Sequence, residues 1–260
     1  MLLWVITPFL LCLLFSLKPS LGSNNTIKPR IHNGFSVSPN GVPFQTLILS
    51  VNTRSDLIQC GGVIYGKRTV LSAAHCFRNV SIDEISVFAG INNINEVKLI
   101  NSFNVKKIKI HPNYTKPGSY SNDLAIVCLE KPLTFSDTVK SIGLVNKEPV
   151  AESRASMYGW GKSKNKRGTL GIELLQANVT LRSTEFCKRI YNMDPSEICT
   201  FDPIMKTNAC KGDSGSPLVQ NGKLIGIGSF SNSQYCEGKS VSFFINIIQF
   251  RDFIKNNKCE

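Results

Sequence analysis

Short apolar runs alternate with polar breaks over most of this chain. From residue 44 onward the runs have the length of β-strands and are interrupted by Gly, Pro, Asn and Ser. Examples cover residues 44–51, 69–72, 85–89, 124–129 and 224–227. Many short strands with few helical periods predict an all-β barrel or sandwich. One helix is predicted near the C-terminus, where Ile247, Phe250 and Ile254 fall on one face and Lys255 follows.

A longer apolar run, residues 2–17, comes first and is followed by Ser20-Leu21-Gly22. The run is too short to span a membrane comfortably, and small residues stand where a signal peptidase would cut. We therefore predict a signal peptide over residues 1–22 and a secreted, extracellular protein. No internal repeat or low-complexity linker divides the rest of the chain.

The formal net charge of the 260 residues is +12. Positive residues concentrate in two runs, 106–109 and 162–167. Such runs are usually solvated faces, and attraction to anionic glycans or acidic substrates is the functional alternative. Nucleic acid is not expected as a partner, because the sequence contains no recognisable binding module. Nothing in the sequence indicates more than a monomer.

Cysteine usage fits an exported chain. Nine cysteines become eight if Cys12 leaves with the signal peptide, and an even number in such a chain predicts disulfides. The spacings contain no Cys-x-x-Cys pair, so no zinc site is expected. Candidate glycosylation sites begin at Asn79, Asn113 and Asn178, each the first residue of an Asn-x-Ser/Thr acceptor.

The stretch over residues 210–217 reads Cys-Lys-Gly-Asp-Ser-Gly-Ser-Pro. A serine in such a turn, here Ser214, can expose its hydroxyl beside backbone N–H groups, which an acyl-transfer nucleophile requires. The same residue types are the commonest in ordinary turns. Taken alone, the stretch therefore predicts a turn more readily than a catalytic site.

Two other stretches change that interpretation. Residues 71–76 read Leu-Ser-Ala-Ala-His-Cys and contain His75, and residues 121–127 read Ser-Asn-Asp-Leu-Ala-Ile-Val and contain Asp123. The chain order His, Asp, Ser distinguishes one of three unrelated hydrolase folds that share a triad. With these motifs the chain resembles the chymotrypsin-like serine protease family from residue 30 to its C-terminal segment.

The resemblance implies a peptidase domain over residues 31–260. It would consist of two six-stranded antiparallel Greek-key barrels, residues 31–143 and 144–260, with a C-terminal helix and a catalytic site in the cleft between the barrels. The reaction would need no cofactor and no metal. The loop over residues 90–96, which binds calcium in some relatives, offers one carboxylate here, so no tight calcium site is expected.

Each catalytic role follows from the resemblance. Ser214 would be the acylated nucleophile, and His75 the general base and then the general acid. Asp123 would orient His75, with Ser229 as its hydrogen-bond partner. The backbone N–H groups of Gly212 and Ser214 would form the oxyanion hole. The substrates would be proteins or peptides.

The resemblance also implies a zymogen. Residues 23–30 would be an activation propeptide, and a separate trypsin-like enzyme would cleave after Arg30. The freed amine of Ile31 would then pair with Asp213, because a buried carboxylate needs a counter-charge.

The sequence departs from the family at two places. His32-Asn33 stands where the family usually has Val-Gly after the isoleucine, and Ser216 replaces a glycine. An alternative interpretation is a protease-shaped binding or inhibitory protein that is impaired at these positions. The intact triad favours the enzyme.

The specificity pocket predicted from the resemblance is neutral. Asn208 occupies the pocket-floor position, which is an aspartate in trypsin-like members, so a preference for Lys or Arg is not expected. Ser231 and Ser242 replace two wall glycines. Leu, Phe, Asn, Gln and small side chains all remain acceptable. Three aromatic residues are expected nearby, two flanking the neighbouring subsite and one under the pocket: Tyr120, Phe230 and Tyr191.

Three disulfides follow from the resemblance: Cys60–Cys76, Cys187–Cys199 and Cys210–Cys236. Cys128 and Cys259 are left over, and spacing alone cannot pair them. Because the family's C-terminal helix packs on the strand that would carry Cys128, we predict a bridge between these two residues.

Overall fold

The computed structural model describes residues 31, 34–38, 40–98, 102–114, 120–161, 171–193, 195–232 and 240–260. The segments predicted to be the signal peptide and the propeptide, residues 1–22 and 23–30, lie outside the described residues, as do His32-Asn33 and the basic run 162–167. Within the described ranges, no helix is long and apolar enough to cross a membrane.

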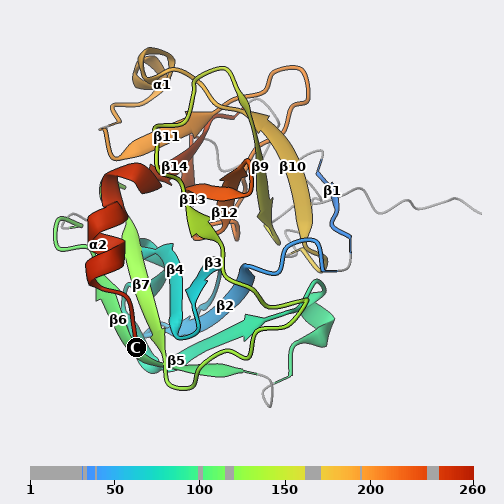
Figure 1. The fold of residues 1–260 in the computed structure, drawn as a ribbon, viewed down its shortest axis with the longest axis vertical. Helices are drawn as coiled ribbons and strands as arrows, with labels where there is room; N and C mark the ends of the chain where they lie inside the picture. Colours follow the sequence, from blue (N-terminus) through green and yellow to red (C-terminus); the bar gives the residue numbers. More distant parts are fainter. Residues whose placement is uncertain are drawn as a thin grey trace, which may run out of the picture.

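The first half of the chain forms a closed antiparallel barrel (Figure 1). Its strands are β2 (Gln45–Asn52), β3 (Leu57–Gly66), β4 (Thr69–Ala73), β5 (Val80–Ala89), β6 (Phe103–Ile110) and β7 (Leu124–Leu129). The order around the barrel is β2-β3-β4-β7-β6-β5. Every residue of β7 is buried, which explains its continuous apolar sequence. The interior is filled by aliphatic side chains such as Ile48, Ile64 and Val127.

The second half of the chain, joined by β1 from the N-terminal region, forms an eight-stranded sheet. Its strands are β1 (Phe35–Ser36), β8 (Gly143–Leu144), β9 (Arg154–Gly159), β10 (Leu175–Thr180), β11 (Glu197–Thr200), β12 (Pro217–Gln220), β13 (Lys223–Ser231) and β14 (Ser242–Asn246). The order is β1-β10-β9-β12-β13-β14-β11, and β8 adds to β13 in parallel. The other pairs are antiparallel.

Strands β9 to β14 come close to closing a second ring. Leu181, just after β10, forms an isolated bridge with Thr200 at the end of β11, and the amide of Phe201 donates to the carbonyl of Thr180 over 3.1 Å. With this link, the six strands follow the same Greek-key order as the first barrel. The predicted all-β architecture is confirmed, with β1 and β8 as additions to the second barrel.

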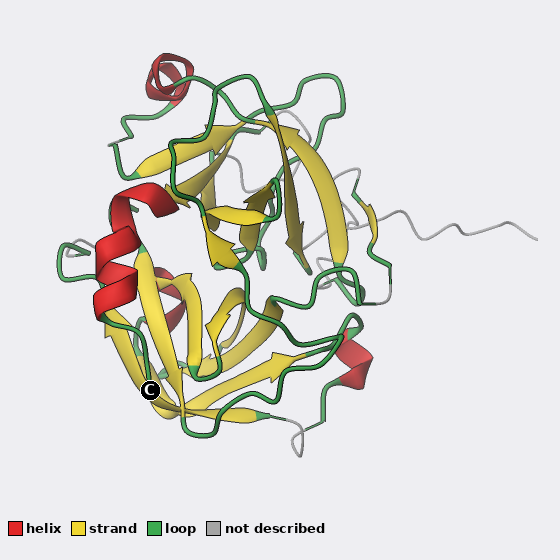
Figure 2. Cartoon of the chain, in the orientation of Figure 1, coloured by secondary structure: helices red, strands yellow, loops and turns green. Residues whose placement is uncertain are grey.

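The predicted C-terminal helix is present as a 3₁₀ turn, Ile247–Phe250, followed by α2, Arg251–Asn256. Ile247, Phe250 and Ile254 are all buried, as the spacing predicted. The sequence analysis missed α1, Thr184–Ile190, which has seven residues and buries only Cys187. Figure 2 shows how little of the chain is helical.

Three of the four expected disulfides lie within the described residues: Cys60–Cys76, Cys128–Cys259 and Cys187–Cys199. Cys210 is also disulfide-bonded, while Cys236 lies outside the described residues. The Cys128–Cys259 bridge joins β7 to the C-terminal tail. Thr69 adds to it, accepting from the amide of Cys259 over 3.0 Å. The tail that leaves the second barrel is therefore fastened to the first.

Candidate active site

His75 and Asp123 come together because their strands are neighbours. β4 and β7 pair with Ala73 opposite Leu124, and the two functional residues lie just beyond that pair. His75 is in the 3₁₀ turn Ala74–Phe77 that follows β4. Its amide donates to Asp123 Oδ1 over 2.8 Å, and its Nδ1 lies 2.7 Å from Oδ2. This double contact fixes the imidazole with Nε2 directed away from the carboxylate.

Asp123 is fully buried and is held from both barrels. In addition to its contacts with His75, its Oδ2 accepts a hydrogen bond of 2.6 Å from the hydroxyl of Ser229 on β13. A buried carboxylate is costly unless several donors satisfy it. The partner expected from the sequence resemblance, Ser229, is therefore in contact with Asp123.

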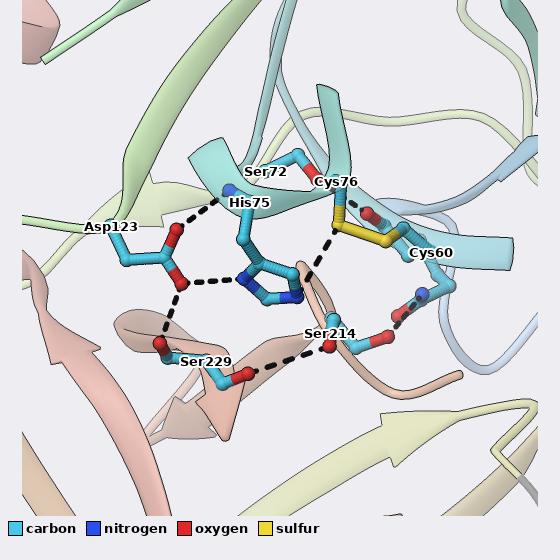
Figure 3. The surroundings of a disulfide bond; sticks show 10 residues. Cys60, Ser72, His75, Cys76, Asp123, Ser214 and Ser229 are labelled. Atoms are coloured by element: carbon cyan, nitrogen blue, oxygen red, sulfur yellow. Dashed lines mark hydrogen bonds and ion pairs between the residues drawn. A yellow bond between two sulfur atoms is a disulfide. The ribbon is translucent and has the colours of Figure 1, made fainter. Parts of the chain in front are cut away.

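Ser214 lies in the turn that precedes β12 (Figure 3). Figure 3 shows the imidazole of His75 between the carboxylate of Asp123 and the side chain of Ser214. Ser214 Oγ donates to the carbonyl of Ser229 over 3.4 Å, a long contact that leaves the hydroxyl easily redirected. The site thus combines a hydroxyl, an imidazole and a buried carboxylate.

The turn around Ser214 depends on glycine at two positions. Gly212 and Gly215 have φ values of 101° and 80°, a region that side chains disfavour. A Cβ atom on Gly215 would also lie 2.2 Å from the carbonyl oxygen of Gly61. Among the described residues, the amides of Gly212 and Ser214 donate to no acceptor. Both N–H groups are therefore available to a ligand oxygen.

Asp213 lies in a small space that exists because its neighbours Gly159 and Gly161 have no side chains. Its carboxylate accepts from the amides of Gly161, over 2.7 Å, and Cys210, over 2.8 Å. A Cβ on Gly159 or Gly161 would lie 2.0 Å or 2.2 Å from a carboxylate oxygen. Burial raises the pKa of Asp213 to about 7, against the opposing effect of the two amide donors.

The side chain of Ile31 is also fully buried. It packs in the core of the second barrel with residues of β9 and β12 such as Met157 and Leu218. Ile31, the residue that cleavage after Arg30 would make the N-terminus, is therefore anchored in this core.

A cavity of about 200 Å³ opens beside Ser214. Its lining includes His75, Tyr120, Lys211, Phe230 and Ser231. The ring of Phe230 stacks on Tyr120 from the first barrel at 4.3 Å and on Phe243 at 4.5 Å. Tyr191 packs on Phe230 at 4.8 Å. The three aromatic residues expected from the sequence form one cluster around Phe230.

Asn208 and Ser242 do not line the cavity but contact Ala209, which does. Both residues are fully buried. Asn208 Nδ2 donates to the carbonyl of Ala209 over 2.9 Å. The amide of Ala209, which lines the cavity, donates to Ser242 Oγ over 2.9 Å. The two residues thus hold the wall in place, whereas Ser231 is part of the lining itself.

Cys60, His75 and Cys76 offer ligand-type atoms within 4.8 Å of one another. The two sulfur atoms form a disulfide, so neither is available as the thiolate that a metal would need. This cluster is therefore not a metal site.

The sequence analysis missed two residues of the first barrel that hold the nucleophile turn. The amide of Gly61 donates to the carbonyl of Ser214 over 2.7 Å, and Gln45 Nε2 donates to Ser216 Oγ over 3.2 Å. One signal was available: Gln45 is a polar residue near the start of the strand-length run 44–51.

Two β-barrels that together supply a histidine, an aspartate and a serine define a protease of the chymotrypsin-like fold class. The Trypsin family model matches residues 31–254, and the chain belongs to that family of serine proteases.

Named relatives agree with this assignment. The chain is 32% identical over 271 residues to prostatic glandular kallikrein-6 of Rattus norvegicus, covering 97% of each chain. It is 30% identical over 230 residues to kallikrein-4 of Homo sapiens, covering 87% of this chain and 86% of the relative. Among solved structures it is similar to neuropsin, a serine protease expressed in the limbic system of mouse brain. That match has a TM-score of 0.75 and 27% identity, and covers 86% of this chain and 97% of neuropsin.

Proposed function

We propose that this protein is a secreted serine endopeptidase that cleaves peptide bonds through an acyl-enzyme on Ser214. The observation that carries the proposal is the 2.7 Å contact between His75 Nδ1 and the buried Asp123, beside Ser214. The contact explains how the imidazole keeps the tautomer that leaves Nε2 ready to accept a proton.

In the proposed reaction, Ser214 Oγ turns from the carbonyl of Ser229 and attacks the scissile carbonyl carbon. His75 takes the hydroxyl proton and returns it to the leaving amine, and water then hydrolyses the ester. The buried charge of Asp123 stabilises the imidazolium. The amides of Gly212 and Ser214 receive the oxyanion, and losing one such donor costs about 3 kcal/mol in comparable sites.

We propose further that the chain is a zymogen with a signal peptide over residues 1–22 and a propeptide over 23–30. The buried carboxylate of Asp213 has amide donors but no cation partner among the described residues. Cleavage after Arg30 by a trypsin-like enzyme would supply one, because it converts the amide of Ile31 into an ammonium group.

The proposed specificity is for neutral side chains, because Asn208, which lies behind Ala209 in the cavity wall, is an amide where a preference for Lys or Arg would need a carboxylate. A charged Lys or Arg side chain would lose its hydration there without gaining a carboxylate partner.

Attraction to anionic glycans is a separate proposal. It is supported by Lys106 and Lys107, which are adjacent and exposed on β6. We expect the Lys106→Glu/Lys107→Glu variant to elute from a heparin resin at lower salt than the unmodified protein. Elution of both proteins at the same salt concentration would argue against anionic glycans as a partner.

The alternative function, a protease-shaped binding protein, is tested by covalent labelling. The protein is activated with trypsin, treated with an organofluorophosphonate and analysed by mass spectrometry, with Ser214→Ala as the control. The expected result is labelling of Ser214 only after cleavage between residues 30 and 31. A completely cleaved, fully bridged protein that takes up no label would favour the binding protein.

A further inference from the structure

The residue that departs from the family beside the nucleophile, Ser216, makes a side-chain contact across the two barrels. Ser216 lies two residues after Ser214, and its exposed fraction is 2%. Its Oγ accepts the 3.2 Å hydrogen bond from Gln45 Nε2, which comes from the first residue of β2 in the first barrel. Gln45 is equally buried. The contact joins residues that are 171 positions apart.

The protein has room for this hydroxyl because the neighbouring strand carries a glycine. A Cβ atom on Gly61 would lie 2.0 Å from Ser216 Oγ and 2.9 Å from Gln45 Nε2. The serine therefore fills a small space without displacing the turn. A buried hydroxyl in such a space stabilises its surroundings only when it is hydrogen-bonded, and Gln45 provides that bond.

Backbone hydrogen bonds also hold the turn on both sides of Ser214. Towards the second barrel, the amide of Gly215 donates to the carbonyl of Gly228 over 2.7 Å, and the amide of Gly228 donates to the carbonyl of Ser216 over 2.8 Å. Towards the first barrel, the amide of Gly61 reaches Ser214. Between Ser214 and Ser216 stands only Gly215, the residue type with the greatest backbone freedom.

We propose that the Gln45–Ser216 pair is a positioning device for the nucleophile. By fixing the turn on the far side of Gly215, it limits the movement of Ser214 Oγ and of the Ser214 amide relative to His75. Neither residue lines the cavity beside Ser214. Because a misplacement of about 1 Å can cost as much as 10²-fold in rate, a side-chain bond at this point changes the chemical step. The proposal rests on Ser214 being the nucleophile.

The test measures how fast Ser214 reacts in the cleaved, activated protein. An organofluorophosphonate is the probe. The labelling rate is measured at several reagent concentrations, which gives both the maximal first-order rate and the concentration at which half of that rate is reached. A first-order rate does not depend on the concentration of the reactive protein, so a variant that yields less folded protein is still informative. The variants are Ser216→Ala, Gln45→Met and the double variant, in which both polar partners are replaced by apolar groups.

Each single substitution should lower the maximal rate about threefold to tenfold, the factor that corresponds to one net hydrogen bond. The half-saturating concentration should stay within a factor of about two, since no contact with the reagent is lost. The double variant should react no more slowly than the slower single variant, because both substitutions remove the same bond.

Thr69→Val is the matched control. It removes a different buried hydroxyl, which bonds to the C-terminal tail at Cys259, and it should lower the melting temperature without changing the maximal rate. Unchanged maximal rates in Ser216→Ala and Gln45→Met would overturn the proposal, as would single effects that multiply in the double variant. The Ser214→Ala variant separates the two proposals: label uptake by that variant would refute the nucleophile assignment itself.

Discussion

The carboxylate of Asp213 should make the uncleaved chain less stable as the pH rises. Its pKa is about 7 in the folded protein against an ordinary value of 3.8, so between these values the folded state binds a proton that the unfolded state has released. The contribution of Asp213 to stability is therefore highest below pH 4, falls as the pH rises towards 7, and does not recover above it. Three pKa units correspond to about 4 kcal/mol in total.

The perturbation that isolates this group is Asp213→Asn, which cannot titrate. In an asparagine, the side-chain N–H₂ would face one of the amide donors from Gly161 and Cys210, at a cost of about 1–3 kcal/mol that does not depend on pH. Only the slope of stability against pH is therefore compared. Between pH 5 and pH 8 the unmodified protein should lose roughly 2–3 kcal/mol more of its free energy of unfolding than the variant.

The assay is urea unfolding of the uncleaved chain at pH 5, 6, 7 and 8, with the disulfides intact and in a Ser214→Ala background that prevents self-cleavage. Every other titratable group is common to both proteins, so its contribution cancels in the comparison. After cleavage behind Arg30, the new ammonium group should abolish the difference in slope near neutral pH. Parallel slopes in the uncleaved proteins would refute the conclusion that Asp213 is buried without a counter-charge from the part of the chain that the structure describes.

Three other perturbations test separate parts of the structure. Ser229→Ala removes the 2.6 Å hydrogen bond to Asp123 and should lower kcat about tenfold with little change in KM; an unchanged kcat would show that the bond is dispensable. Asn208→Asp should shift cleavage of a peptide library from neutral residues towards Arg and Lys, and an unaltered library profile would argue that Asn208 does not form the pocket floor. Replacing Cys128 and Cys259 by serine opens a loop with a sequence separation of 131 and should cost about 4–5 kcal/mol in the free energy of unfolding; urea unfolding at equal pH measures it, and a loss below about 1 kcal/mol would contradict the tether.

Some elements could not be predicted because their sequence lacks the usual period. The first half of β5 was missed, since residues 81–84 are all exposed and show no apolar alternation. Pairing makes it a strand: Asn52 at the end of β2 lies opposite Val80. Helix α1 was missed because it buries one side chain, Cys187, too little to give a helical pattern.

The sequence alone determined the strand-rich architecture, the C-terminal helix and the candidates His75, Asp123 and Ser214. The strand-length apolar runs, the spacing of three apolar residues and the motif order can all be found in the sequence without the structure. The tertiary structure decided what surrounds these residues: the glycine-walled niche that raises the pKa of Asp213, the stacking of Tyr120 on Phe230, and the bond between Gln45 and Ser216. These contacts join positions up to 171 residues apart, and they exist only because the two barrels pack with the nucleophile turn between them. A local pattern specifies which face of a strand is buried, but not which distant polar group will meet it.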